Sequence, residues 1–92
     1  MSFSVMFVDD DPALLASLRR QMRELRKEYS LAFASDGRDA LAQIEDNPVD
    51  LIISDMRMPN MDGAQLLTQM AQRNPDTMRI ILSGQAESQQ LF

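Results

Sequence analysis

The 92-residue sequence contains no cysteine and no histidine, and these two absences exclude several kinds of chemistry. Without cysteine the chain has neither a disulfide framework nor a cysteine-based zinc site. Without histidine it has no histidine general base, no Ser-His-Asp triad and no histidine metal ligand. Any chemistry must therefore use carboxylates, hydroxyls, backbone groups and a hard metal ion.

Basic residues are also few, nine against fourteen acidic ones, and the net charge is −5. A nucleic-acid surface needs a basic patch or stripe, so we expect no nucleic-acid contact through this domain. The apolar runs are too short to cross a bilayer, and residues 1–4 lack the basic start of a signal peptide. We therefore expect a cytoplasmic protein without membrane contact. The length and the 45% hydrophobic content predict one folded domain.

Short apolar runs alternate with amphipathic segments, a pattern that predicts an α/β protein with a parallel sheet covered on both faces. Asp11 and Asp62 are expected to be N-caps of the first and third helices. The first helix should run from Pro12 to about Glu28, and the second and third should end at Asn-Pro pairs. The expected strands are residues 4–8, 29–34, 49–54 and 78–82, and a further helix opens at 85–92.

Acidic and hydroxyl residues follow the predicted strands. Asp9 and Asp10 come after the first strand, Asp55 ends the third, and Ser83 follows the fourth. Ligands of open parallel sheets bind outside the carboxyl ends of the strands, so these carboxylates converge if the first and third strands are neighbours. Such a cluster repels itself unless a cation neutralises it, and Mg²⁺ is a hard ion suited to a few carboxylates, waters and phosphate oxygens. The alternative is that these aspartates only cap the following helices.

Four ordered motifs resemble the receiver domains of two-component response regulators, and the resemblance covers the whole chain. The motifs are F-V-D-D-D-P after the first strand, L-I-I-S-D ending the third, the loop M-P-N-M-D-G, and I-I-L-S-G at the fourth. The resemblance implies a flavodoxin-like doubly wound parallel sheet with strand order 2-1-3-4. It also implies a phospho-accepting signalling protein, rather than a metabolic enzyme, that takes its phosphoryl group from a sensor histidine kinase and switches an output domain.

The same resemblance assigns a role to each site residue. Asp55 matches the phosphoacceptor, whose carboxylate attacks phosphorus. Asp9, Asp10 and Asp55 would hold Mg²⁺, and Arg57 would lend its main-chain carbonyl to the ion. Ser83 matches the hydroxyl residue that turns toward the bound phosphoryl group.

The family pattern continues beyond this sequence with a helix, a strand and another helix, and it places a lysine after the fifth strand. The only lysine here, Lys27, lies on the first predicted helix. We therefore expect residues 1–92 to be the N-terminal portion of a receiver domain, in which the fourth helix is only begun and the fifth strand and fifth helix are absent, from a longer regulator. The edge of strand 78–82 is then expected to form a homodimer or a segment-swapped dimer.

Two other readings are compatible with parts of the sequence. Asp9 and Asp11 form a D-x-D motif after a strand, as in haloacid-dehalogenase-like phosphatases, but that reading leaves the loop D-M-R-M-P-N-M-D-G unexplained. The second alternative is a receiver-like interaction module, which binds a partner but does not switch by phosphorylation.

Overall fold

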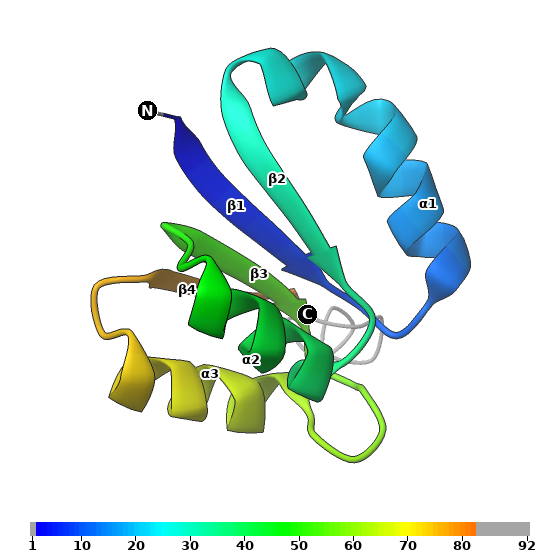
Figure 1. The fold of residues 1–92 in the computed structure, drawn as a ribbon. Helices are drawn as coiled ribbons and strands as arrows, with labels where there is room; N and C mark the ends of the chain where they lie inside the picture. Colours follow the sequence, from blue (N-terminus) through cyan, green and yellow to red (C-terminus); the bar gives the residue numbers. More distant parts are fainter. Residues whose placement is uncertain (1, 83–92) are drawn as a thin grey trace, which may run out of the picture.

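Four parallel strands form one sheet in the order β2-β1-β3-β4 in the computed structural model, which describes residues 2–82 (Figure 1). This arrangement confirms the predicted α/β class and strand order. The helix expected to open at 85–92 lies outside the described residues. The elements are β1 (Phe3–Val8), α1 (Pro12–Gln21), the 3₁₀-helix η1 (Arg23–Lys27), β2 (Tyr29–Ala34), α2 (Gly37–Asp46), β3 (Leu51–Asp55), α3 (Gly63–Arg73) and β4 (Met78–Leu82).

The predicted helix caps at Asp11 and Asp62 are confirmed. The Asp11 carboxylate accepts the N–H groups of Ala13 at 2.9 Å and Leu14 at 3.3 Å. Asp62 accepts the N–H of Gln65 at 2.8 Å, and the Gln65 side chain accepts the N–H of Asp62 at 2.9 Å, which completes a capping box. Both caps fix where the chain leaves a strand end and enters a helix.

The first helix is shorter than predicted. It was expected to reach about Glu28, but α1 ends at Gln21, where the N–H of Met22 donates to the Leu18 carbonyl at 2.8 Å. The next turn is η1, in which the Leu25 N–H donates to Met22 only three residues back. No residue of η1 is buried, so little packing favours α-helical geometry over the tighter turn here.

The third strand begins at Leu51, two residues later than the predicted start at Val49. The Thr77 hydroxyl donates to the Val49 carbonyl at 2.7 Å, and the Asp50 carboxylate accepts the Ser4 N–H at 2.8 Å. Side chains therefore form hydrogen bonds with the Val49 carbonyl and the Ser4 N–H, and regular strand pairing starts at Leu51.

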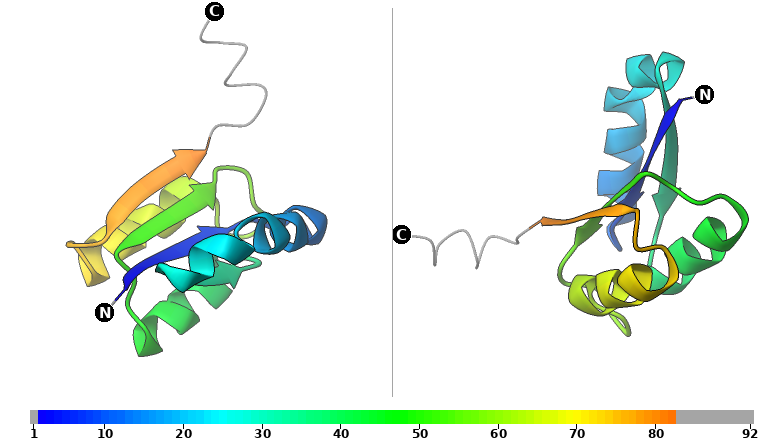
Figure 2. Two further views of the ribbon diagram at one scale, coloured as in Figure 1. Left: turned by 90° about the horizontal axis from the view of Figure 1, so that it is seen from above. Right: turned by 90° about the vertical axis from the view of Figure 1, so that its left-hand side faces the viewer.

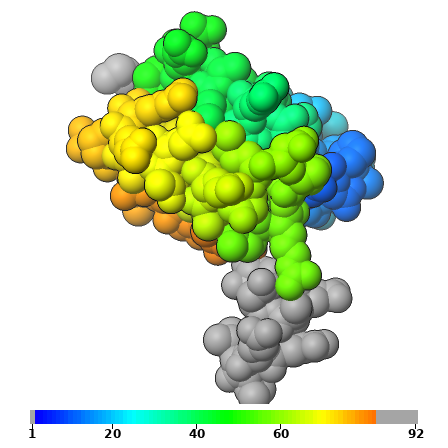
Figure 3. Space-filling model, turned by 90° about the horizontal axis from the view of Figure 1, so that it is seen from below, coloured from blue at the N-terminus to red at the C-terminus, as the bar shows by residue number. Residues whose placement is uncertain are grey.

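The main core lies between the sheet and helices α2 and α3, which occupy the same side of it (Figure 2). Seen from below, these two helices form the surface over the sheet, with β4 along one border (Figure 3). Met6, Ile52, Leu66 and Met70 have at most 1% of their surface exposed. The predicted apolar stripes of these helices are therefore core contacts.

Helix α1 lies on the opposite side of the sheet and covers it unevenly (Figure 2). The rings of Phe7 and Phe33 stack with centroids 5.6 Å apart, and the guanidinium of Arg19 lies 5.0 Å from the Phe33 centroid. All five residues of β4 are exposed, Met78 by 59% and Leu82 by 53%. Within the described residues, the predicted covering of both faces therefore does not extend to β4, in keeping with the open edge expected at residues 78–82. Within residues 2–82, no helix combines the length and apolar character that a bilayer span requires.

Candidate metal centre

Three carboxylates meet at the carboxyl ends of β1 and β3. Val8 and Ser54 are register partners in adjacent strands, so the residues that follow them emerge side by side. One carboxylate oxygen from each of Asp9, Asp10 and Asp55 lies within 4.8 Å of the other two. The convergence expected from the sequence is therefore present.

Burial and mutual repulsion act on this cluster. Asp9 and Asp55 are half-buried, whereas Asp10 is exposed. The pKa of Asp9 is raised above the ordinary aspartate value, first because burial disfavours its charge, and then because the charges of Asp55, Asp10 and Asp11 repel it. The main-chain N–H of Asp11 donates to Asp9 Oδ1 at 2.9 Å and opposes this rise. The arrangement favours a bound cation.

The chemistry of these ligand atoms fits a hard divalent ion. Carboxylate oxygens are the ligands that Mg²⁺ and Ca²⁺ prefer, and Mg²⁺ commonly takes one or two carboxylates together with waters and phosphate oxygens. Asp10 is exposed and Asp9 and Asp55 are half-buried, so solvent can reach the cluster and could supply water or phosphate oxygens as further ligands.

The remaining residues with predicted roles are Arg57, Ser83 and Asp11. Arg57 lies two residues after Asp55 with an exposed side chain, and the role of its carbonyl as a metal ligand stays a prediction. Ser83 and its neighbour Gly84 lie outside the described residues. The carboxylate of Asp11 serves as the cap of α1, which leaves it poorly suited to the acid role of the D-x-D alternative.

Two residues that the sequence reasoning did not single out contact the main chain at Asp55. The hydroxyl of Ser54, which is completely buried, donates to the Asp55 carbonyl at 2.8 Å. The N–H of Gly63 donates to the Met56 carbonyl at 2.8 Å. Two features of the sequence could have pointed to these contacts: Ser54 is a polar residue inside an apolar strand, and Gly63 directly follows the capping residue Asp62.

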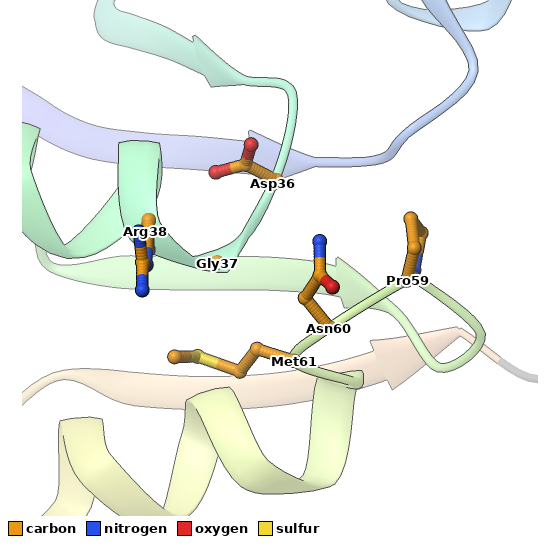
Figure 4. A pocket seen from close by; sticks show the side chains of 6 residues that line it. All are labelled: Asp36, Gly37, Arg38, Pro59, Asn60 and Met61. Atoms are coloured by element: carbon orange, nitrogen blue, oxygen red, sulfur yellow. The ribbon is translucent and has the colours of Figure 1, made fainter.

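A separate surface pocket of about 450 Å³ lies between the start of α2 and the loop that follows β3 (Figure 4). Asn60 in this loop has a φ of 70°, a left-handed conformation that asparagine tolerates better than most residues. None of the three clustered aspartates lines the pocket, so it is distinct from the acidic cluster. The lining residues are Asp36, Gly37, Arg38, Pro59, Asn60 and Met61.

Comparison with known sequences identifies one family. The family model for the response regulator receiver domain matches residues 5–92. Transcriptional regulatory protein GlrR of Escherichia coli K12 is 39% identical over 80 residues, which are 87% of this chain and 18% of that protein. Response regulator MprA of Mycolicibacterium vanbaalenii is 33% identical over 84 residues, 91% of this chain and 36% of that one. The chain thus spans only a small part of these relatives.

Solved structures show the same fold. The signal receiver domain of an HD domain-containing protein from Pseudomonas fluorescens Pf-5 matches with a TM-score of 0.84 and 36% identity, covering 91% of this chain and 66% of that one. The receiver domain of the Francisella response regulator 1452 matches with a TM-score of 0.79 and 30% identity, covering 97% and 72%. These similarities favour the receiver prediction over the dehalogenase-like alternative.

Proposed function

The chain belongs to the family of response regulator receiver domains, and on that basis we propose that it acts as a signalling switch that accepts a phosphoryl group on Asp55. The observation that carries the proposal is the convergence of the Asp9, Asp10 and Asp55 carboxylates within 4.8 Å at the carboxyl ends of neighbouring strands. Asp55 is the last residue of β3 and is only half-buried, as a group that must be reached by a phosphodonor requires.

We propose that Asp9, Asp10 and Asp55, together with the main-chain carbonyl of Arg57, hold Mg²⁺. The bound ion would supply positive charge to the oxygens of the transferring phosphoryl group and relieve repulsion among the carboxylates. The pKa of Asp9 is raised first by burial and then by the neighbouring carboxylates, and a bound cation would offset both effects, which supports this assignment.

The group transfer is a displacement at phosphorus by a carboxylate nucleophile. An Asp55 carboxylate oxygen forms a new P–O bond while the bond from phosphorus to the leaving group breaks, and the leaving group keeps the electron pair. From the phosphohistidine of a sensor histidine kinase, our proposed partner, the broken bond is P–N and the imidazole nitrogen leaves with its pair. Ser83 is proposed to donate its hydroxyl hydrogen bond to the phosphoryl group.

The output of the switch belongs to the longer proteins of the family. The relatives GlrR and PrrA are described as transcriptional regulatory proteins, and this chain matches only part of each. We propose a corresponding role in which phosphorylation changes the contacts of an output domain, in a cytoplasmic protein.

Labelling with a small phosphodonor tests the proposal. The chain is incubated with acetyl phosphate, with Mg²⁺ or with a chelator, and the modified residue is located by mass spectrometry. We expect Mg²⁺-dependent modification of Asp55, none in Asp55→Asn, and normal modification in the control Asp76→Asn, which removes an exposed carboxylate outside the cluster. Unchanged labelling of Asp55→Asn would refute the proposal, and labelling of Asp9 would favour the dehalogenase-like alternative. Failure of the unmodified chain to label would favour a non-switching interaction module.

We further propose that two copies of residues 1–92 associate through β4. This strand ends the described sheet and is exposed throughout, and an exposed apolar edge can pair with another chain. In sedimentation velocity over a concentration series, Ile80→Lys should shift the chain toward monomer. Leu14→Lys on α1 is the control, since Leu14 and Ile80 are both 42% exposed. A monomer at every concentration would reject the proposal.

A further inference from the structure

Ser54 is a polar residue at a position that the fold makes part of the core. Its side chain is completely buried, and its register partner Val8 belongs to the core cluster. A buried hydroxyl without a hydrogen bond is costly, so the direction of its bond is strongly constrained. This hydroxyl donates to the carbonyl oxygen of the next residue, Asp55, at 2.8 Å. The bond ties the peptide that follows Asp55 to the strand that precedes it.

Gly63 packs against the same Asp55–Met56 peptide and hydrogen-bonds the carbonyl of the next one. It is buried as the first residue of α3, and its N–H donates to the Met56 carbonyl at 2.8 Å. A Cβ at this position would lie 3.0 Å from Met56 Cα and 3.2 Å from the Asp55 carbonyl carbon, and closer still to the Asp55 carbonyl oxygen. The start of α3 can rest directly on this peptide because residue 63 has no side chain.

We infer that Ser54 and Gly63 are positioning residues, which hold the Asp55–Met56 peptide and thereby aim the Asp55 carboxylate; this inference rests on the proposed phosphoacceptor role of Asp55. The peptide begins at the main chain of Asp55, so its rotation or displacement changes where the side chain points. A carboxylate oxygen of Asp55 lies within 4.8 Å of oxygens of Asp9 and Asp10, and a change in its direction would alter this grouping. Neither positioning residue needs to touch the ion or the phosphoryl group.

The chain contains a matched control for each residue. Gly37 is also buried as the first residue of its helix, but a Cβ there would meet the sulfur of Met61 at 2.6 Å, the flexible part of a side chain. Thr77 also has a buried hydroxyl that donates to a β3-proximal carbonyl, that of Val49 at 2.7 Å, at the opposite end of the strand. Thr77 therefore matches the hydrogen bond of Ser54, and Gly37 matches the helix-start position of Gly63.

The first measurement is the rate of Asp55 labelling by acetyl phosphate at saturating Mg²⁺, as a function of donor concentration. Gly63→Ala must displace the main chain at Asp55, and a displacement on the order of 1 Å lowers the maximal rate by about 100-fold. Ser54→Ala removes one hydrogen bond and should lower the maximal rate by about threefold to tenfold. The donor concentration for half-maximal rate should stay unchanged in both, and Gly37→Ala and Thr77→Val should keep the wild-type maximal rate.

The second measurement is amide hydrogen exchange followed by NMR, which needs no phosphorylation. Ser54→Ala should speed exchange of the Gly63 N–H by about tenfold, while Thr77→Val leaves it unchanged. If Gly63→Ala does not fold, Ser54→Ala with its control decides the matter. The inference is overturned if Ser54→Ala shows both the wild-type rate of Asp55 labelling and the wild-type rate of Gly63 exchange. It is also overturned if the control variants Gly37→Ala and Thr77→Val slow Asp55 labelling as much as Gly63→Ala and Ser54→Ala do. If the unmodified chain is not labelled at all, the phosphoacceptor proposal fails, and the exchange data still decide whether the peptide is held.

Discussion

Replacement of Asp9 by asparagine should stabilise the metal-free protein and remove most of its stabilisation by Mg²⁺. Asparagine keeps an oxygen that can accept the Asp11 N–H, a hydrogen bond of 2.9 Å in the structure. The substitution therefore removes the charge of Asp9 with little change in shape. What it relieves is the burial cost of a carboxylate together with its repulsion by Asp55 and Asp10.

The separation of the carboxylates sets the size of the repulsion that Asp9→Asn removes. For charges 4.8 Å apart, the distance within which the cluster oxygens lie, Coulomb repulsion is about 0.9 kcal/mol in water and about 3.5 kcal/mol at an effective dielectric constant of 20. Asp10 is exposed and salt screens the pair, so the lower value is the appropriate guide. We expect Asp9→Asn to raise the free energy of unfolding without metal by about 1 kcal/mol, a rise of about 4–8 °C in Tm.

The response to Mg²⁺ is the second half of this prediction. A ligand present at about ten times its Kd stabilises the folded state by about 1.4 kcal/mol, equivalent to about 6–11 °C in Tm for a domain of this size. The unmodified chain should show this shift in differential scanning calorimetry with and without Mg²⁺. Asp9→Asn should show a much smaller shift at the same Mg²⁺ concentration, because one ligand charge is gone.

The charge-matched control is Asp76→Asn, which removes an exposed carboxylate outside the cluster. Its Tm without metal should stay close to wild type, and its full response to Mg²⁺ should remain. A lower metal-free Tm in Asp9→Asn, or an unreduced Mg²⁺ shift in that variant, would show that the three carboxylates do not act as a strained cation site.

Three further predictions concern stability. Without metal, Asp9→Asn should unfold with a higher free energy than wild type, and this difference should depend on pH. It should be absent below about pH 3.9, where Asp9 is protonated in both the folded and the unfolded state. It should grow as the pH rises through the raised folded pKa of Asp9 and then stay constant, as urea unfolding at several pH values can measure. Leu66→Ala should cost about 2–5 kcal/mol in urea unfolding because Leu66 is fully buried, whereas Leu67→Ala, at a partly buried position, should cost less. Asn60→Ala should lower the free energy of unfolding by about 1 kcal/mol, because the φ of Asn60 is 70° and alanine tolerates this conformation poorly. Asn60→Gly should not lower it, and equal effects of the two substitutions would argue against this backbone constraint.

The sheet was predictable because its signals are local. Each strand is a compact apolar run, and the capping aspartates mark where helices start, as Asp11 and Asp62 do. The first helix was overestimated because its charged continuation fits a helical pattern, although no residue of Arg23–Lys27 is buried. Periodicity shows which residues could form a helical face, but the packing decides whether that face is used.

The acidic cluster was predictable for a different reason. Once β1 and β3 are neighbours, the geometry of a parallel sheet brings the residues after Val8 and Ser54 together. The contacts of Gly63 with the Asp55–Met56 peptide could not be predicted in this way, because they depend on how the loop between β3 and α3 folds back. No periodic pattern records that return, and in the sequence only the loop motif M-P-N-M-D-G with its final glycine points to it.

The acidic cluster is destabilised by repulsion, whereas the backbone contacts that surround it are stabilising, and the site needs both. The carboxylates of Asp9, Asp10 and Asp55 repel one another, so without a cation they would move apart if their backbones were free to do so. Register pairing fixes the end of β1 against β3, and the Ser54 and Gly63 hydrogen bonds restrain the first turn of chain after Asp55. A rigid backbone converts the repulsion into affinity for a divalent ion, because relaxation cannot relieve it. Loosening this segment should therefore weaken Mg²⁺ binding while it stabilises the metal-free cluster, a combination that general destabilisation of the fold would not produce.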